Sequence, residues 1–377
     1  MNKSDTALYA PLPAGIRSRM LAGVNGLDMH ILEAGHETPG RPLVLLLHGF
    51  PELAYSWRKV MGPLAQAGFH VVAPDQRGYG HTTGWDAEYD GDLGSFRILN
   101  IVRDTLGLVD ALGARQAAVV GHDFGSPVAA WCALLRPDIF RAVALMSAPF
   151  GGPPGRAAAG VDPVHAELAA LPRRRKHYQW YYATRPANAD MLYCRQGVHD
   201  FLRAYYHHKS ADWAGNRPYR LAGWTAAELA KMPTYYIMDL DEDMAQTVAH
   251  EMPTAAEIAA CGWLSEAELG VYAAAFSRTG FQGGLQWYRA RIARRFNTEM
   301  EIFAGRAITV PSCFIGGASD WGVFQRPGDF ERMQGTGCAN MVSCHLVPGA
   351  GHWVQQEQPA AVSAHLLDFF RAAGVAP

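Results

Sequence analysis

The sequence carries few charged residues and no concentration of one sign. Charged residues make up 18% of the 377 positions, and the formal net charge is -2. There is no long run of lysine and arginine, whereas nucleic acids and anionic membranes are bound by clustered positive charge. These absences argue against both kinds of partner. The densest basic cluster, Arg173 to Lys176, is expected to be a solvated helix face.

The chain also lacks the patterns of metal sites, disulfide frameworks and membrane spans. Its six cysteines are scattered and form no CxxC pair, so neither a zinc site nor a set of disulfides is indicated. Residues 1–18 contain no apolar core of signal-peptide length, and no apolar run is long enough to cross a bilayer. We therefore expect a cytoplasmic protein without a metal or an organic cofactor.

What the sequence does contain is a set of short apolar runs that alternate with helical patterns. Hydrophobic residues make up 49% of the chain, enough for a large core. Apolar runs bounded by turn residues are typical of fully buried parallel strands, and an antiparallel hairpin with its turn at Asn25-Gly26 precedes them. The pattern predicts a doubly wound, mostly parallel α/β sheet. The predicted buried strands lie at 42–47, 69–74, 116–120 and 142–149.

A long interruption divides this pattern into two parts. After Pro149 the alternation stops for about 150 residues that are rich in tyrosine and tryptophan, and it resumes at 307–317 and 340–352. An insertion between two halves of one sheet is typical of a cap seated over the carboxyl edge of the strands. We predict a core domain of residues 1–149 and 300–377, and a mainly helical cap of residues 150–299.

Three side chains that can act together follow the predicted strands. Asp123 lies in "GHDFG", Asp320 in "GGASDWG" and His352 in "GAGHW". The order of nucleophile, acid and base is that of the α/β-hydrolase fold, with aspartate where the nucleophilic serine usually stands. Because an open α/β sheet places its ligand site at the carboxyl ends of its strands, we expect the three to meet.

A carboxylate nucleophile restricts the chemistry. It is a poor nucleophile toward amides and esters, but it can open a strained ring or displace a leaving group at sp³ carbon. The resulting ester on Asp123 would be hydrolysed by water that His352 activates, with Asp320 orienting the imidazole. The backbone N–H groups of Phe50 and Phe124 are predicted to form the oxyanion hole.

The motifs "HGFPELAYSWR", "APDQRGYG", "GHDFG" and "GAGHW" resemble, in order, those of the epoxide hydrolases with an α/β-hydrolase fold. The resemblance implies hydrolysis of an epoxide to a vicinal diol, a role in detoxification, and two cap tyrosines that activate the epoxide oxygen. "HYQWYY" points to Tyr178 as the first, and "VYAAAFSRTGFQGGLQWYR" points to Tyr272 as the second. The stretch 207–266 makes this cap longer than the caps of that family usually are.

The composition of the cap also predicts the kind of substrate. A weakly charged, aromatic cap favours a small apolar epoxide in a closed pocket, with water as the second reactant. Side chains at the strand ends and next to the motifs are the natural candidates for its wall. They are Phe50, Pro51, Trp57, Trp321 and Trp353.

Two other functions remain open on the sequence. A haloalkane dehalogenase shares the aspartate nucleophile, but commonly has a tryptophan N–H after it to hold the halide, and this position is Phe124. A non-catalytic ligand-binding protein could use the same fold. His122 is expected to be structural, and Arg77 and Asp75 are expected to form a structural ion pair.

Overall fold

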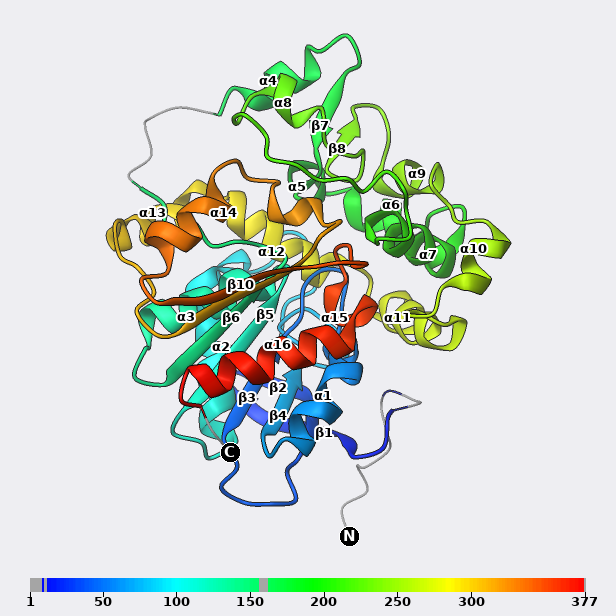
Figure 1. Cartoon of the computed structure of the whole chain (residues 1–377). Helices are drawn as coiled ribbons and strands as arrows, with labels where there is room; N and C mark the ends of the chain where they lie inside the picture. Colours follow the sequence, from blue (N-terminus) through cyan, green and yellow to red (C-terminus); the bar gives the residue numbers. More distant parts are fainter. Residues whose placement is uncertain (1–8, 10–11, 156–161, 376–377) are drawn as a thin grey trace.

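The computed structural model describes residues 9, 12–155 and 162–375. These residues form an eight-stranded sheet in the order β1-β2-β4-β3-β5-β6-β9-β10 (Figure 1). β2 pairs antiparallel with both β1 and β4, and the strands from β4 to β10 run parallel. The predicted fold class is therefore confirmed. The strands are β1 (Ile16–Val24), β2 (Leu27–Ala34), β3 (Leu43–Leu47), β4 (His70–Pro74), β5 (Ala117–His122), β6 (Phe140–Met146), β9 (Ser312–Gly317) and β10 (Met341–Val347).

The hairpin between β1 and β2 has the predicted two-residue turn. Val24 pairs with Leu27, and the intervening Asn25 and Gly26 both have positive φ, 49° and 82°. Two consecutive residues in the left-handed region form a turn whose twist matches that of the strands, and Asn-Gly adopts it readily.

Helices cover both faces of the sheet, so its central strands are apolar throughout. Every residue of β3 and β5 is buried, as expected of parallel strands with helices on each side. α2 and α3 contact one another and strands β1, β5 and β6, while α1 and α16 contact one another and strands β4, β9 and β10. The core helices include α1 (Arg58–Gln66), α2 (Ile98–Ala111), α3 (Gly125–Leu135), α14 (Asp329–Arg332), α15 (Val354–Glu357) and α16 (Pro359–Ala372).

Between β6 and β9 the chain leaves the sheet and forms helices and a small second sheet, β7 with β8 (Figure 1). The division predicted at residues 150 and 299 stays a prediction. The basic cluster is not a helix face: Arg175 belongs to β7 and is buried. The inserted elements are α4 (Val164–Ala169), β7 (Arg175–His177), α5 (Tyr178–Tyr182), α6 (Ala187–Leu192), α7 (Gly197–Lys209), α8 (Ala226–Leu229), β8 (Ile237–Asp239), α9 (Met244–Ala249), α10 (Ala255–Ala260), α11 (Glu266–Thr279), α12 (Gln282–Ile292) and α13 (Arg294–Met300).

The inserted helix α12 packs closely on the loop that follows β4. A β-carbon on Gly283 would lie 2.0 Å from the carbonyl oxygen of Gly78, so the two backbones meet where no side chain fits. The indole N–H of Trp287 donates to the carbonyl of Arg77 at 2.9 Å. The Arg77 guanidinium pairs with Asp104 at 2.7 Å, so the predicted pair with Asp75 is wrong.

No helix formed by the described residues has both the length and the apolar character needed to cross a membrane.

Candidate active site

Asp123 occupies a sharp turn between β5 and α3. Its φ of 51° lies in the left-handed region, which lifts the side chain out of the line of the strand. The glycines on either side make the turn possible. A β-carbon on Gly121 would lie 2.0 Å from the carbonyl oxygen of Gly125, and one on Gly125 would lie 2.2 Å from that of Leu47.

The structure brings the three predicted side chains of the triad together. The Nε2 atom of His352 lies 3.3 Å from Oδ2 of Asp123, and its Nδ1 atom lies 3.1 Å from Oδ1 of Asp320. The carboxylate of Asp320 also accepts a hydrogen bond from the backbone N–H of Gly322 at 2.6 Å. A proton on Nδ1 directed at Asp320 leaves the lone pair on Nε2 free to take a proton from water.

The two oxygens of the Asp123 carboxylate have different surroundings. The backbone N–H of Phe50 donates to Oδ1 of Asp123 at 2.9 Å, as expected for an oxyanion hole. Gly49 allows this approach, because a β-carbon there would lie 2.3 Å from that of Asp123. The N–H of Phe124, at the start of α3, stays a predicted second donor.

The charge of the nucleophile is supported by its surroundings. Burial by itself would raise the pKa of Asp123, but the imidazole of His352 and the positive charges of Lys209 and His122 hold this pKa below its usual range. The pKa of Asp320 is likewise lowered: burial acts against ionisation, while His352 and the Gly322 N–H favour it. Asp123 is therefore a carboxylate at neutral pH.

The charge of this carboxylate raises the pKa of several buried tyrosines in the insertion, among them Tyr178 and Tyr205. Burial and then the charge of Asp123 raise the pKa of Tyr178. Its hydroxyl donates to Oε1 of Gln325 at 3.2 Å and accepts from Gln179. The pKa of Tyr205, on α7, is also raised, by burial with Tyr178 and Asp123 adding to it. Tyr182 donates to the Tyr205 oxygen, so the proton of Tyr205 is free for another acceptor.

Comparisons with known proteins agree with this geometry. Residues 42–359 match the alpha/beta hydrolase fold family. Epoxide hydrolase A of Mycobacterium tuberculosis is 35% identical and aligns over 94% of this chain and 98% of its own length. The chain belongs to the epoxide hydrolases of the α/β-hydrolase fold.

Solved structures of epoxide hydrolases share the whole architecture. The epoxide hydrolase from an endophytic Streptomyces superimposes with a TM-score of 0.77 at 30% identity, over 97% of this chain and 98% of that one. Epoxide hydrolase A from Mycobacterium thermoresistibile gives a TM-score of 0.75 at 34% identity, over 94% and 98% of the two chains. The enzyme's resemblance thus extends through the insertion as well as the sheet.

The hydroxyl of Tyr272 is not among the groups that the structure brings to the triad. It lies 2.9 Å from Oγ of Ser56 and 3.3 Å from Nη1 of Arg58, and it donates to Oε1 of Gln356 at 3.0 Å. All three partners belong to the core: Ser56 lies just before α1, Arg58 begins α1, and Gln356 lies in α15. The predicted role of Tyr272 in epoxide activation would require its hydroxyl to leave them.

The residues predicted to line the pocket are all buried, but in different places. The ring of Phe50 packs edge-on against Tyr182 and Tyr288, with centroids 5.2 and 5.4 Å apart, so it faces the inserted helices near Asp123. The ring of Trp353 packs edge-on against that of His352, with centroids 4.7 Å apart, so it borders the triad. The remaining contacts involve residues outside the triad. The Pro51 carbonyl accepts from Tyr206 at 2.7 Å, the Trp353 indole donates to the Tyr206 carbonyl at 2.9 Å, the Trp321 ring packs on Tyr219, and Trp57 is fully buried in the core.

A second buried ion pair supports the triad from behind, as expected of a structural His122. Its Nδ1 atom lies 2.5 Å from Oε2 of Glu52, and its Nε2 atom lies 2.7 Å from the carbonyl oxygen of His352. Burial alone would lower the pKa of His122, but the charge and hydrogen bond of Glu52 raise it. His122 therefore carries a proton that holds the backbone of the catalytic base.

Lys209 is the charged residue that sequence reasoning missed. Only 3% of it is exposed, and its Nζ atom lies 5.0 to 5.7 Å from the ring centroids of four aromatic side chains. Burial lowers the pKa of Lys209, while Asp123, Asp320 and Glu52 oppose that shift. A lysine in "YYHHKS" gives no sign in the sequence that it will be enclosed. The four rings are those of Tyr205, Tyr235, Tyr236 and Trp353.

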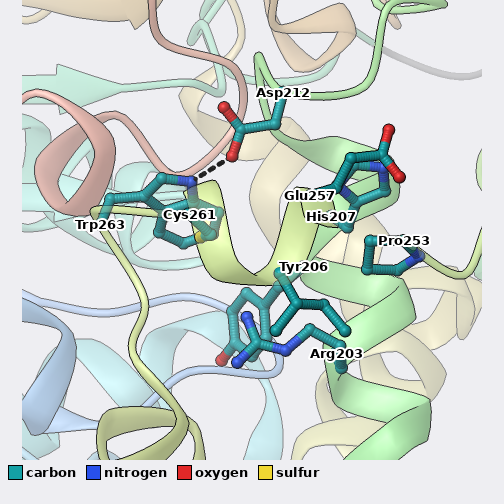
Figure 2. A pocket seen from close by; sticks show the side chains of 9 residues that line it. Arg203, Tyr206, His207, Asp212, Pro253, Glu257, Cys261 and Trp263 are labelled. Carbon is teal, nitrogen blue, oxygen red and sulfur yellow. Dashed lines mark hydrogen bonds between the residues drawn. The ribbon is translucent and has the colours of Figure 1, made fainter. Parts of the chain in front are cut away.

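Part of the long segment 207–266 lines a small pocket away from the triad, whereas Lys209, Tyr235 and Tyr236 of the same segment lie in the surroundings of the triad. The volume of this pocket is about 10 Å³, too small for an organic substrate. Figure 2 shows the indole of Trp263 pointing to Asp212, its hydrogen-bond acceptor at 2.8 Å. No member of the triad lines this pocket. Among the described residues there is also no group of three or more potential metal ligands.

Proposed function

We propose that the protein hydrolyses epoxides to vicinal diols through a covalent ester on Asp123. The observation that carries the proposal is that the two oxygens of the buried Asp123 carboxylate have different neighbours. Its Oδ1 atom is held by the N–H of Phe50, and its Oδ2 atom lies 3.3 Å from the imidazole of His352. The homologous epoxide hydrolases support the same reaction.

In the first step, Oδ2 of Asp123 attacks one carbon of the epoxide and the bond from that carbon to the ring oxygen breaks. The alkoxide that leaves is strongly basic, so it needs a proton as the bond breaks. Of the buried phenols in the insertion whose pKa the charge of Asp123 raises, we assign this task to Tyr178 and Tyr205. The product is an alkyl ester and one phenolate.

In the second step, His352 takes a proton from water and the hydroxide adds to Cγ of Asp123. The negative charge then develops on Oδ1, where the Phe50 N–H already donates. Collapse breaks the bond between Cγ and Oδ2 and releases the diol, which takes its proton from the imidazolium. The carboxylic acid left on Asp123 returns its proton to the phenolate, which restores the enzyme. Asp320 stabilises that imidazolium through Nδ1.

The walls near Asp123 favour an apolar substrate body. The ring of Phe124 packs edge-on against Tyr288 and Trp287, with centroids 4.5 and 5.6 Å apart, and Phe50 adds a further ring. Phe124 has no side-chain N–H, and the Trp287 N–H is already bonded to the backbone. Neither Phe124 nor Trp287 therefore offers a free side-chain N–H to a departing halide.

A single turnover in heavy-oxygen water tests the mechanism. With enzyme in excess over an epoxide, the first diol should contain only unlabelled oxygen, because the new oxygen comes from Asp123. The label should then appear in Asp123 itself, in a peptide analysed by mass spectrometry. A labelled first diol would mean that water attacks the epoxide directly, and the covalent mechanism would be wrong.

His352→Gln provides a second test. The variant should still form the ester but hydrolyse it slowly, so the intact protein should gain the mass of the substrate. His36→Gln, which alters a histidine outside the triad, should show no such accumulation, and Asp123→Ala should show no adduct at all. An adduct that persists in Asp123→Ala would place the nucleophile elsewhere.

A further inference from the structure

Two glutamines from different parts of the chain contact the hydroxyl group of Tyr178. The side-chain amide of Gln179 donates to the phenol oxygen at 3.0 Å, and the phenol donates its proton to Oε1 of Gln325 at 3.2 Å. Gln179 follows Tyr178 on α5, whereas Gln325 lies between β9 and α14. The hydroxyl of Tyr178 therefore has a donor from the insertion and an acceptor from the core.

Each glutamine is attached to a fixed part of the site. The backbone N–H of Gln179 donates to Nδ1 of His177 at 3.2 Å. Burial, with nearby positive charges adding to it, lowers the pKa of His177 to about 3, so this ring is neutral and its Nδ1 atom can accept. The side-chain N–H of Gln325 donates to the carbonyl of Gly322 at 3.3 Å, and the N–H of Gly322 donates to Asp320 at 2.6 Å. Gln325 therefore belongs to the same turn that carries the acid of the triad.

The second phenol that we assign to the reaction, Tyr205, lacks such an acceptor. Its oxygen accepts from the hydroxyl of Tyr182 at 3.2 Å, and among the residues that the structure describes its own proton has no protein acceptor. A substrate oxygen can therefore accept from Tyr205 directly. To accept from Tyr178 as well, the substrate oxygen must first replace Oε1 of Gln325.

We propose that Gln325 and Gln179 are positioning residues that control when Tyr178 gives up its proton. Gln325 holds the phenol proton until the epoxide oxygen replaces it, and Gln179 stabilises the phenolate that remains after the transfer. This inference rests on the proposed function and specifies how one of its two acids is controlled. Glutamine suits both positions, because its uncharged amide offers both an acceptor and two donors.

The two contacts change in opposite ways when the epoxide opens. As Oδ2 of Asp123 bonds to the carbon, the bond from that carbon to the ring oxygen breaks, and the proton of Tyr178 passes to that oxygen. Oε1 of Gln325 has no proton to offer the phenolate, so this hydrogen bond is lost. The N–H of Gln179 still donates, and its hydrogen bond becomes stronger because the acceptor is now charged. Burial and the charge of Asp123 oppose the phenolate, and the hydrogen bond from Gln179 favours it.

The test measures ester formation and ester hydrolysis separately, by stopped-flow tryptophan fluorescence with styrene oxide as the apolar epoxide. In Gln325→Met the substrate no longer has to replace an acceptor, so the rate constant of ester formation divided by the dissociation constant of the epoxide should rise about fivefold. In Gln179→Met the phenolate loses its donor, so the rate constant of ester formation should fall about tenfold. Neither change should alter ester hydrolysis, because His352 and not Tyr178 activates the water.

Glutamate variants separate hydrogen bonding from packing, because glutamate has nearly the shape of glutamine but no amide donor. In Gln325→Glu the carboxylate should hold the phenol proton more strongly and repel the phenolate, so ester formation should slow at least about tenfold, opposite to the methionine variant. Gln179→Glu should form the ester more slowly than Gln179→Met. Gln334→Glu is the matched control, because this exposed glutamine donates to the Phe330 carbonyl at 3.0 Å and does not contact Tyr178. It should leave both steps unchanged.

The possible failures can be told apart. If Gln325→Met forms the ester no faster than the wild type, Gln325 does not hold the proton back, and unchanged ester formation in Gln179→Met would overturn the role of Gln179. Equal slowing of both steps in the two methionine variants would mean that the glutamines only pack against Tyr178. In each of these cases the epoxide hydrolase function stands. If the wild type forms no ester with any epoxide, the proposed function itself fails. The rate of ester hydrolysis also reports whether each variant is folded.

Discussion

At the scale of single residues, the tyrosines of the insertion differ in what surrounds their hydroxyl groups. Tyr178 and Tyr205 both feel the charge of Asp123, whereas Tyr272 is bonded to Ser56, Arg58 and Gln356. A phenol that protonates the leaving oxygen contributes to formation of the ester and not to its hydrolysis. The two steps therefore need to be measured separately.

We expect Tyr178→Phe and Tyr205→Phe each to slow ester formation about a hundredfold, since general acid catalysis is commonly worth that much. Tyr272→Phe should slow it less than fivefold, but should cost about 1 kcal/mol of stability because it leaves buried polar partners unsatisfied. Stopped-flow tryptophan fluorescence measures the rate of ester formation, and urea unfolding measures the stability. A large effect of Tyr272→Phe together with a small one of Tyr205→Phe would restore Tyr272 as the second acid.

Lys209 offers a prediction about pH. Its charge helps to hold the pKa of Asp123 below the usual range, so Lys209→Met should raise that pKa by about one unit or more. Only the carboxylate attacks, so the pH below which ester formation slows should move upward by the same amount. Glu52, Asp320 and His122 remain in place.

The measurement is the rate of ester formation as a function of pH in single-turnover experiments. The wild-type rate should stay level down to about pH 5, and Lys209→Arg should keep most of that range. Lys59→Met, which removes a half-buried lysine outside the site, is the control. Superimposable profiles for Lys209→Met and the wild type would show that the charge of Lys209 does not act on the nucleophile.

At the scale of elements, the loop that carries His352 is fixed to the insertion by one carboxylate. Glu357 of α15 accepts from the N–H groups of Gly351, Trp353 and Ala211 at 2.9, 2.9 and 2.8 Å. The N–H of His352 donates to the carbonyl of Lys209 at 2.9 Å. His352 is thus positioned by the end of α7 as well as by the loop that follows β10.

Glu357→Ala would leave three buried N–H groups without an acceptor. At about 1–3 kcal/mol for each, we expect a loss of at least about 3 kcal/mol of stability in urea unfolding. Hydrolysis of the ester should slow more than its formation, because His352 acts only in hydrolysis. Glu299→Ala, in an exposed pair with Arg97, should change neither. Equal slowing of both steps would mean that the loop does not position His352 in particular.

At the scale of the whole molecule, we expect activity to depend on how closely α12 packs on the core. The contact between Gly283 and Gly78 brings two backbones together, and α12 carries Trp287 and Tyr288 onto the ring of Phe124. A shift of α12 would therefore change the pocket even though no catalytic group is altered.

Gly283→Ala should force such a shift. We expect kcat/KM to fall at least about tenfold and stability to fall by about 1–3 kcal/mol. Gly270→Ala is the matched control, since a β-carbon at Gly270 meets nothing within 4 Å and alanine favours a helix. It should leave activity unchanged and raise stability slightly. Full activity in Gly283→Ala would show that the close approach has no part in shaping the site.

The sheet, the order of the triad and the family could all be predicted from the sequence. A short, continuous apolar run indicates a strand that is buried on both faces. The glycines on either side of Asp123 indicate a sharp turn after such a strand, because only glycine fits where two backbones approach closely. Asp123, Asp320 and His352 were found in this way, because strand ends in an open sheet gather at one edge.

Which distant side chains meet could be seen only in the folded structure. Arg77 forms its ion pair with Asp104 and not with Asp75. Arg175 lies in the buried strand β7, and the Tyr272 hydroxyl accepts a hydrogen bond from Arg58. Lys209 is enclosed by rings from three segments. Partners of long polar side chains depend on how elements pack, and no local pattern in the sequence records that packing.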